Sequence, residues 1–186
     1  MSAKIDQIIY ETAVREGFSP TAAKFVVAQA RFESADYTSN VFRNNLNTSG
    51  MKYIGQPLAE RGTLAPANER SAACRTQNVC RNSDYYAKFD SVADSAKDKI
   101  QRNYSITIKG VTPEQLKNAK TPEEFARLLK QRGYYGDKES TYAAGIRAKL
   151  MRIQVVEFIS KNRNMLLLGA GLVLVGAAYY MYKKKN

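Results

Sequence analysis

The hydrophobic and polar positions at the start of the chain repeat with the period of an α-helix. Apolar residues recur three or four positions apart over residues 5–13 and 22–32. Ser19 and Pro20 precede the second stretch and are typical of a helix start, because serine caps free backbone N–H groups and proline has no N–H that needs a partner. Most of the surface of residues 22–32 is apolar, which predicts a helix that is buried on more than one side.

The helical period disappears between residues 47 and 86, where glycine, proline, serine, asparagine and arginine dominate. A loop of that length without structure is uncommon inside a compact domain, so we expect a small β-lobe of short strands or a shaped binding loop. Capping signals around this lobe predict further helices that start after Thr38 or Ser39, after Asp90-Ser91, after Thr112, after Thr121, and at Ser140. In the helix after Thr121, Glu124 is expected to complete a capping box and Gly133 to end the helix.

An apolar run without charge closes the chain at residues 165–182. It exceeds the lower limit of about 17 residues for crossing a bilayer, it ends in tyrosines, and basic residues flank it on both sides. We therefore expect a mainly α fold with a domain over residues 1–160, a C-terminal transmembrane helix and a basic tail over 183–186. A buried core helix is the alternative for this run. The first residues lead directly into an amphipathic pattern, so no signal peptide is expected.

Composition narrows the chemistry that this chain can perform. Histidine is absent, which excludes zinc hydrolases with histidine ligands, Ser-His-Asp hydrolases and Cys-His peptidases, but leaves acid–base chemistry on carboxylates. The net charge of +12 favours polyanionic partners, yet the basic residues are scattered, which argues against a specific nucleic-acid site. No metal or cofactor is expected. Cys74 and Cys80 lie close together in a polar segment, and we favour a short-loop disulfide over two free thiols.

Glu33 is the strongest candidate for a catalytic group. It stands near the end of the apolar helix, beside Phe32, and a run of polar turn residues follows it. The negative end of the helix dipole and apolar surroundings both disfavour an ionised carboxyl. We therefore expect the pKa of Glu33 to be raised, as a general acid working near neutrality requires. The alternative is an ordinary solvated glutamate at a helix end.

Four short blocks follow one another over about residues 5–150. In chain order they are Glu33-Ser34-Ala35-Asp36-Tyr37, Asn44-Asn45-Leu46 with Gly50-Met51-Lys52, Tyr86-Ala87-Lys88-Phe89-Asp90-Ser91, and Gly133-Tyr134-Tyr135-Gly136-Asp137 with Tyr142-Ala143. Together they resemble the glucosaminidase domain of glycoside hydrolase family 73, found in the flagellar rod's peptidoglycan hydrolase and in bacterial and phage autolysins. Two features depart from the family pattern: its Gly-Trp-Gly turn is missing, and residues 47–49 interrupt its Leu-Phe-Gly join.

The resemblance implies a lysozyme-like helical fold with a small β-lobe and places the general acid at Glu33. It also implies a second acidic group in the β-lobe, for which Glu69 is the best-placed candidate, followed by Glu60 and Asp84. Asp90 is expected to cap its helix instead of taking part in chemistry, because it stands where an N-cap is needed. Either a carboxylate or the substrate's own acetamido group can stabilise the opposite face of the sugar, so the stereochemical outcome stays open.

The implied activity is hydrolysis of β-1,4 bonds in peptidoglycan on the reducing side of N-acetylglucosamine. Asn45, Tyr134 and Tyr142 are the expected substrate-binding residues, and the alternative for the two tyrosines is packing beneath the cleft. A lytic transglycosylase or muramidase of the same fold is the nearest competing function. A membrane-anchored wall-binding protein without turnover and a basic nucleic-acid module are the others; only the charge supports the last.

The expected setting is a membrane that the chain crosses once, near its C-terminus. Such a span without an export signal would ordinarily leave the preceding domain in the cytoplasm, away from the cell wall. The three terminal lysines favour the opposite orientation, although Lys161 and Arg163 weaken that preference. A bacteriophage protein that is carried on a virion membrane, or that acts at lysis, reconciles these features; whether the membrane is viral or cellular stays open. The partners are then peptidoglycan strands and a lipid bilayer; the oligomeric state stays open.

Overall fold

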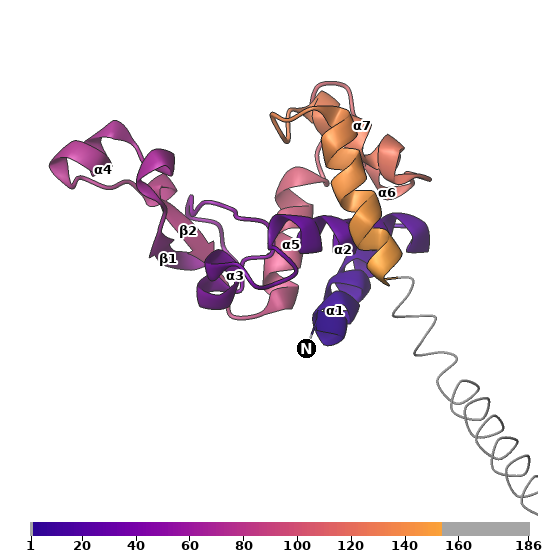
Figure 1. Cartoon of the computed structure of the whole chain (residues 1–186), viewed down its shortest axis with the longest axis horizontal. Coiled ribbons are helices and arrows are strands. Elements are labelled where there is room, and N and C mark those ends of the chain that lie inside the picture. The colour runs from indigo at the N-terminus through magenta and orange to yellow at the C-terminus, as the bar shows by residue number, and fades with distance from the viewer. Residues whose placement is uncertain (1, 154–186) are drawn as a thin grey trace, which may run out of the picture. The chain divides into compact units, whose positions relative to one another are not determined.

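The computed structural model describes residues 2–153 of the chain (Figure 1). The chain divides into two units, residues 1–150 and 151–186, and the description below concerns the first. The predicted membrane helix at 165–182 and the basic tail at 183–186 lie outside the described residues. Within 2–153, no helix has both the length and the apolar character that a bilayer span needs.

Helices form the larger part of the domain and surround one central helix. They are α1 (Ser2–Arg15), α2 (Pro20–Glu33), α5 (Val92–Asn103), α6 (Pro113–Lys117), α7 (Pro122–Arg132) and a helix that begins at 139. α1 packs against α2 and α5, and α2 also contacts α6 and α7. Because α2 has neighbours on several sides, it buries residues around most of its circumference, which confirms the expectation from its wide apolar surface.

Capping explains where most of these helices begin. Ser19 accepts a hydrogen bond from the backbone N–H of Ala22, and Pro20 is the first residue of α2, as predicted. Ser39 caps α3 (Asn40–Asn45). The expectation for Asp90 was wrong, because the next residue, Ser91, caps α5 and accepts from the N–H of Asp94. A serine hydroxyl in that position leaves the Asp90 carboxylate unengaged as a cap.

The capping box predicted for α7 forms only in part. The Thr121 hydroxyl accepts from the N–H of Glu124, as expected. The Glu124 carboxylate accepts from the N–H of Lys120 instead of that of Thr121, so it bonds one residue earlier than a capping box requires. Gly133 ends α7 with a φ of 78°, in the left-handed region, which confirms its predicted role.

The segment between α3 and α5 forms a small lobe around a two-stranded antiparallel sheet. β1 (Glu60–Leu64) pairs with β2 (Tyr85–Lys88), with Glu60 opposite Lys88 and an irregularity between Arg61 and Leu64. Between the strands lie two short 3₁₀ helices, η1 (Ala67–Glu69) and η2 (Asn82–Asp84), and a helix that the sequence did not predict, α4 (Ala72–Gln77). Figure 1 shows α4 at the end of the hairpin that is farther from α1 and α2.

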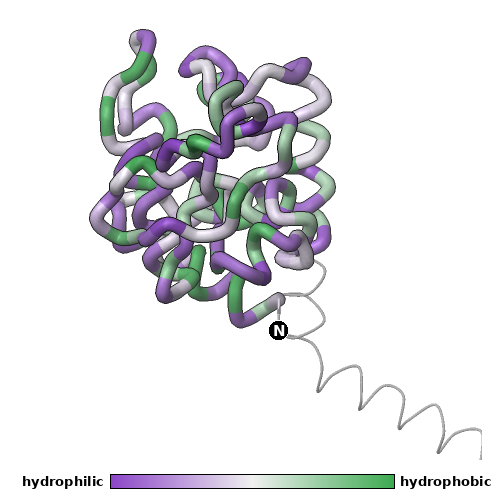
Figure 2. Tube along the Cα trace, turned by 90° about the vertical axis from the view of Figure 1, so that its left-hand side faces the viewer, coloured by the Kyte–Doolittle hydropathy of each residue, from purple (hydrophilic) through white to green (hydrophobic). Residues whose placement is uncertain are grey.

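The core of the helical part is built around aromatic rings. Tyr104 is fully buried, and its ring lies 5.8 Å from that of Phe18 and 6.2 Å from that of Phe125. Phe125 in turn packs against Phe25 of α2 at 5.9 Å. Polar and hydrophobic residues are interspersed along the whole described trace (Figure 2), as expected for short helices that each bury one face.

A left-handed turn follows α2 directly. Ala35, Asp36 and Tyr37 have φ values of 52°, 55° and 65°, a region that residues with a Cβ atom seldom adopt. Asp6 of α1 holds this turn, because its carboxylate accepts hydrogen bonds from the Tyr37 hydroxyl at 2.8 Å and from Arg31 Nε at 2.9 Å. None of these three residues is glycine, so the turn carries backbone strain close after Glu33.

Replacing Ala35 by glycine should stabilise the protein by roughly 0.5–1 kcal/mol. The left-handed conformation costs a residue with a Cβ roughly 1–2 kcal/mol, and the greater entropy of an unfolded glycine offsets part of the relief. Ala93 in α5 has ordinary helical geometry and serves as the control, since Ala93→Gly should cost about 1 kcal/mol. Urea unfolding of both variants measures the difference; a loss of stability in Ala35→Gly would contradict the strain.

Candidate active site

The structure gathers a cluster of polar side chains around the carboxylate of Glu33, the last residue of α2. Its Oε1 accepts hydrogen bonds from the Tyr142 hydroxyl at 2.6 Å and from Gln29 Nε2 at 2.9 Å. Its Oε2 accepts from the Tyr134 hydroxyl and from Lys99 Nζ, both at 3.1 Å. The Glu33 side chain remains 14% exposed, so part of it is accessible from solvent.

Four elements supply these side chains. Glu33 and Gln29 lie one turn apart on α2, which places them on the same face of that helix. Lys99 comes from α5, Tyr134 follows the Gly133 cap of α7, and Tyr142 belongs to the helix that starts at 139. Segments more than 100 residues apart in the chain therefore meet at one carboxylate. The predicted residues Glu33, Tyr134 and Tyr142 are brought together directly.

The two tyrosines act as neutral hydrogen-bond donors. Burial raises the pKa of Tyr134 and of Tyr142 well above the ordinary value, and the negative charge of Glu33 raises both further. Both phenols therefore keep their protons near neutral pH. Tyr142 is held in place on its two sides: its ring stacks on Tyr135 at 3.8 Å and meets Phe32 edge-on at 5.5 Å.

Sequence reasoning missed Lys99, whose side chain is only 1% exposed. Burial lowers the pKa of Lys99, while the neighbouring Glu33 carboxylate acts in the opposite direction. A signal for this residue was present in the sequence. Ala96 and Ile100 mark the buried face of α5, and Lys99 stands three residues after Ala96 on that face. A lysine on a buried face requires an anionic partner, and Glu33 supplies it.

Gln29 connects the Glu33 cluster to the aromatic core. It is completely buried, and its Nε2 donates to both Glu33 and the Tyr142 hydroxyl. Its Oε1 accepts a hydrogen bond from the hydroxyl of Tyr104. Because both polar atoms of the Gln29 side chain have partners, the amide is fixed in place and in turn fixes the orientation of Glu33 and Tyr142. The sequence analysis did not single out this residue.

The apolar environment predicted for Glu33 was wrong. Phe32, the apolar neighbour used in that argument, packs edge-on against Tyr142. The groups that do face the carboxyl are one buried ammonium, two hydroxyls and an amide. Except for the amide of Gln29, one turn earlier on α2, they come from distant parts of the chain, so the end of one helix does not reveal them.

Glu69, the candidate for a second acidic group, lies in a different cluster. Its carboxylate accepts hydrogen bonds from Lys52 Nζ at 2.7 Å and from the Tyr86 hydroxyl at 2.8 Å. The hydrogen bond from Lys52 is the main cause that lowers the pKa of Glu69, and the side chain is 41% exposed. Glu69 is therefore an ionised, accessible carboxylate of the β-lobe that does not share partners with Glu33.

The other two acidic candidates have different surroundings. Asp84 is buried and accepts hydrogen bonds from the backbone N–H groups of Ser71 and Arg81, which fixes the loop around α4. Those hydrogen bonds, first that of Ser71, lower the pKa of Asp84 and explain it as a structural residue. Glu60 is exposed and pairs with Lys88 across the sheet at 2.6 Å.

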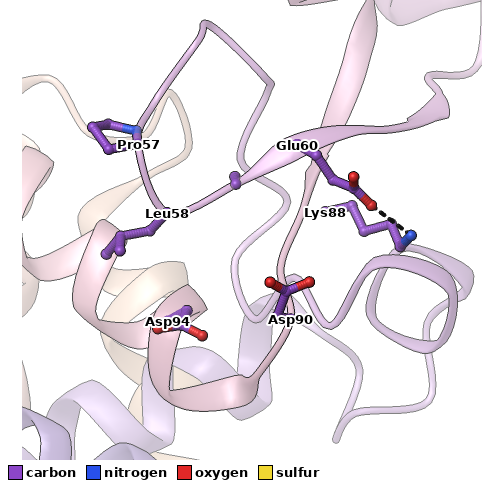
Figure 3. Close-up of a pocket in the computed structure, with 7 residues that line it drawn as sticks. Pro57, Leu58, Glu60, Lys88, Asp90 and Asp94 are labelled. Carbon is purple, nitrogen blue, oxygen red and sulfur yellow. Dashed lines mark hydrogen bonds and ion pairs between the residues drawn. The ribbon is translucent and has the colours of Figure 1, made fainter.

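Glu60 and Lys88 also border a pocket of about 340 Å³ at the junction of the lobe and α5 (Figure 3). The residues that line it are Pro57, Leu58, Ala59, Glu60, Lys88, Asp90 and Asp94. Figure 3 shows the carboxylates of Asp90 and Asp94 on the side of α5 and the Glu60–Lys88 pair on the side of the strands. Asp90 therefore presents an exposed carboxylate beside a cavity. It was not among the catalytic candidates, because it was expected to cap a helix.

Asn45, the third predicted substrate-binding residue, holds the β-lobe together. Its side chain is buried; Nδ2 donates to the carbonyl of Val41 and to the Thr63 hydroxyl, and Oδ1 accepts from the N–H of Thr63. A Cβ on Gly62 would lie only 2.3 Å from Asn45 Oδ1, so β1 passes very close to this amide. The geometry gives Asn45 a role in positioning β1 against α3.

Cys74 and Cys80 form a disulfide that closes α4 and its following turn. Their sulfur atoms lie near the carboxylate of Asp84, a grouping that resembles a metal site in composition. Sulfur atoms bound to each other are not thiolates, and thiolates are what a metal ion requires from cysteine. This grouping therefore does not provide a metal site.

Two solved structures share the fold. The catalytic domain of the autolysin Auto from Listeria monocytogenes superposes with a TM-score of 0.52 at 23% identity, covering 84% of each chain. One chain of a type VI secretion system effector–immunity complex from Pseudomonas protegens gives a TM-score of 0.52 at 20% identity, covering 83% of this chain and 91% of that one. No curated protein matches the sequence.

The family itself follows from the sequence match. A model of the glucosaminidase family, described as mannosyl-glycoprotein endo-β-N-acetylglucosaminidase, matches residues 7–154. That range is most of the chain and includes Glu33 and every side chain that contacts its carboxylate. The mainly helical architecture with a two-stranded sheet agrees with the predicted lysozyme-like fold. The chain therefore belongs to the glucosaminidase family, glycoside hydrolase family 73, and is a glycosidase.

Proposed function

We propose that this protein hydrolyses the glycan strands of bacterial peptidoglycan at the β-1,4 bond on the reducing side of N-acetylglucosamine. The observation that carries the proposal is the Glu33 carboxylate, partly exposed and held by four donors within a glucosaminidase domain. A carboxyl group fixed in this way can be aimed at a glycosidic oxygen, and proton donation to that oxygen is the first requirement of glycoside hydrolysis.

The net charge of +12 supports a polyanionic substrate, since wall polymers carry acidic groups and a basic surface raises their local concentration. One of the structures with this fold is the catalytic domain of an autolysin. Both points favour peptidoglycan over other glycans that contain N-acetylglucosamine.

For the second group of the reaction, we propose a carboxylate of the β-lobe or the substrate's own acetamido group. Glu69 is ionised and accessible, and Glu60 and Asp90 border the pocket of Figure 3. Changing each to its amide separates these choices. A loss of turnover of about 100-fold or more in one variant would identify that carboxylate, whereas near-normal rates in all three would favour the acetamido group.

Product analysis tests the proposed bond. The full chain is incubated with purified peptidoglycan, and the released fragments are reduced and analysed by mass spectrometry. We expect reducing ends that carry N-acetylglucosamine. Reducing ends of N-acetylmuramic acid would identify a muramidase, and anhydro-muramic ends would identify a lytic transglycosylase. Binding of the wall without any released fragment would contradict hydrolysis and would favour a wall-binding protein.

We further propose that residues 165–182 anchor the enzyme in a membrane, because this run is apolar, uncharged and flanked by basic residues. Flotation with lipid vesicles tests the anchor: the full chain should float, and a chain that ends at residue 160 should not.

The virion membrane of a bacteriophage is the proposed setting, and detection of the protein in purified particles would support it. Its presence in host envelopes and absence from particles would contradict that setting.

A further inference from the structure

The Glu33 carboxylate has no unused acceptor position in the structure. Each of its oxygens accepts two hydrogen bonds, and two per oxygen is about all that a carboxylate offers. All four neighbours donate to the carboxylate, and none of them accepts a hydrogen bond from it. A general acid, in contrast, must carry a proton when the glycosidic oxygen leaves. The reaction therefore needs a source of this proton close to Glu33.

Among the four donors, the ammonium of Lys99 is the one whose proton burial makes easier to remove. The amide of Gln29 does not ionise in this range. The phenols of Tyr134 and Tyr142 are held neutral, because burial and the charge of Glu33 raise the pKa of each. The ammonium of Lys99 is different, since burial destabilises its charged form and makes the proton easier to remove.

The surroundings of Lys99 isolate it with Glu33. Its Nζ lies 3.1 Å from Glu33 Oε2 and 5.6 Å from the centre of the Tyr134 ring. Within residues 2–153, Glu33 is the carboxylate that pairs with it. The acidic groups of the two packed helices α1 and α5 have other partners: Asp6 of α1 binds Arg31 and Tyr37, and Asp98 of α5 pairs with Arg102. The hydroxyl of Tyr104 binds Gln29, and the charge of Glu33 raises the pKa of this buried phenol further.

Building on the proposed role of Glu33 as the general acid, we propose that Lys99 is the positioning residue that stores the proton which Glu33 donates. The proton passes from Lys99 Nζ to the Glu33 carboxyl, which leaves a neutral amine beside a carboxylic acid. Glu33 then donates it to the glycosidic oxygen as the bond from that oxygen to the anomeric carbon breaks. Water forms the new bond to the carbon, and the proton that this water loses returns to the Lys99–Glu33 pair. Lys99 thus acts only through Glu33.

Arginine and methionine at position 99 separate proton storage from simple charge pairing. Arginine keeps the positive charge but does not release a proton, whereas methionine removes both. We expect Lys99→Arg to lower turnover at pH 7 by at least about 100-fold, and Lys99→Met to lower it by about tenfold, since Glu33 without a neighbouring cation takes its proton from water more readily. In both variants the alkaline limb of the pH–rate profile should move to lower pH. Turnover of Lys99→Arg equal to that of the wild type, or of Lys99→Met equal to or above it, would overturn the proposal.

Lys97 provides a matched control, because it lies on the same helix and is exposed. Lys97→Arg and Lys97→Met should keep the wild-type turnover and pH profile. Thermal unfolding of each position-99 variant shows whether it folds. A second measurement needs no variant: NMR of the wild-type chain follows the Lys99 side-chain ammonium and the Glu33 carboxyl carbon during a pH titration. We expect both signals to respond at a shared midpoint below that of the exposed lysines, as for two coupled groups.

The two measurements distinguish failure of this inference from failure of the proposed function. A wild-type chain that releases no wall fragments, but whose Lys99 and Glu33 signals titrate together, would contradict the hydrolase and retain the coupled pair. An active wild-type chain in which Lys99 titrates with the exposed lysines and leaves the Glu33 signal unchanged would keep the hydrolase and overturn the storage of the proton.

Discussion

Replacing Glu33 by glutamine should reduce the rate of peptidoglycan hydrolysis by roughly 10²–10⁴-fold, the range that a general acid contributes. The amide has nearly the same shape and can keep hydrogen bonds to Tyr134 and Tyr142 after rotation of their hydroxyls. It has no acidic proton to donate to the leaving oxygen. The loss should therefore appear in kcat, with little change in the amount of wall material bound. Release of dye-labelled fragments from purified wall gives the rates.

Two controls make this result specific. Glu114→Gln, at an exposed position of α6, should leave the rate unchanged. Urea unfolding should show that the Glu33→Gln variant is folded. Some cost in stability is expected, because the NH2 group of the new amide replaces an oxygen that accepted hydrogen bonds from neighbouring donors. A folded variant that clears the wall at the wild-type rate would remove Glu33 from the mechanism.

Replacing Gln29 by leucine should cost roughly 2–4 kcal/mol of unfolding free energy, the second large effect that we expect. Leucine has a similar volume but no polar atoms, so the hydroxyl of Tyr104 loses its acceptor inside the core and Glu33 and Tyr142 each lose a donor. A buried polar group without its partner costs about 1–3 kcal/mol. Urea unfolding of the full chain measures the loss. Gln131→Leu, at an exposed position of α7, should change stability by less than about 0.5 kcal/mol.

A double-mutant cycle with Tyr104→Phe tests the cause of this loss. The phenylalanine ring keeps the aromatic packing and removes the hydroxyl that needs Gln29. In the Tyr104→Phe background, Gln29→Leu no longer leaves a buried hydroxyl at position 104 without an acceptor. The double variant should therefore be more stable than the sum of the single losses by about 1 kcal/mol or more. Strictly additive losses would show that the Gln29–Tyr104 hydrogen bond does not contribute.

The parts of this structure that depend on neighbouring residues could be predicted from the sequence. Ser19-Pro20 starts α2 and Gly133 ends α7 where the capping rules place them, because a cap satisfies backbone groups only a few residues away. Even these rules fail where two capping residues adjoin, as at Asp90 and Ser91, since both carry an oxygen that can accept and the backbone decides which one does.

The surroundings of Glu33 could be predicted only in part. The order of the four motif blocks was enough to indicate Glu33, Tyr134 and Tyr142, which the structure joins by hydrogen bonds. Lys99 and Gln29 belong to no motif block, and their partners lie on other elements or across the core. For such residues the only local sign is a polar side chain on an apolar helix face, and it does not say which distant group will satisfy that side chain.

Asn45 illustrates how a motif residue can also have a structural role. Its place in a motif block predicted contact with substrate, whereas its amide is used entirely in joining β1 to α3. A motif records that a side chain is needed at a position and does not distinguish a ligand contact from an internal hydrogen bond. The close approach of Gly62 to this amide is a tertiary feature that the spacing of the two residues does not reveal.

Counting new reducing ends per bound enzyme tests the central claim, that the carboxyl of Glu33 cleaves a glycan strand, most directly. Wild-type chain and the Glu33→Gln variant are bound in equal amounts to purified peptidoglycan, and reducing-terminal N-acetylglucosamine is quantified over time by mass spectrometry. The account predicts steady accumulation with the wild type and almost none with the variant, at equal binding. Equal accumulation with both proteins, or none with either, would contradict it.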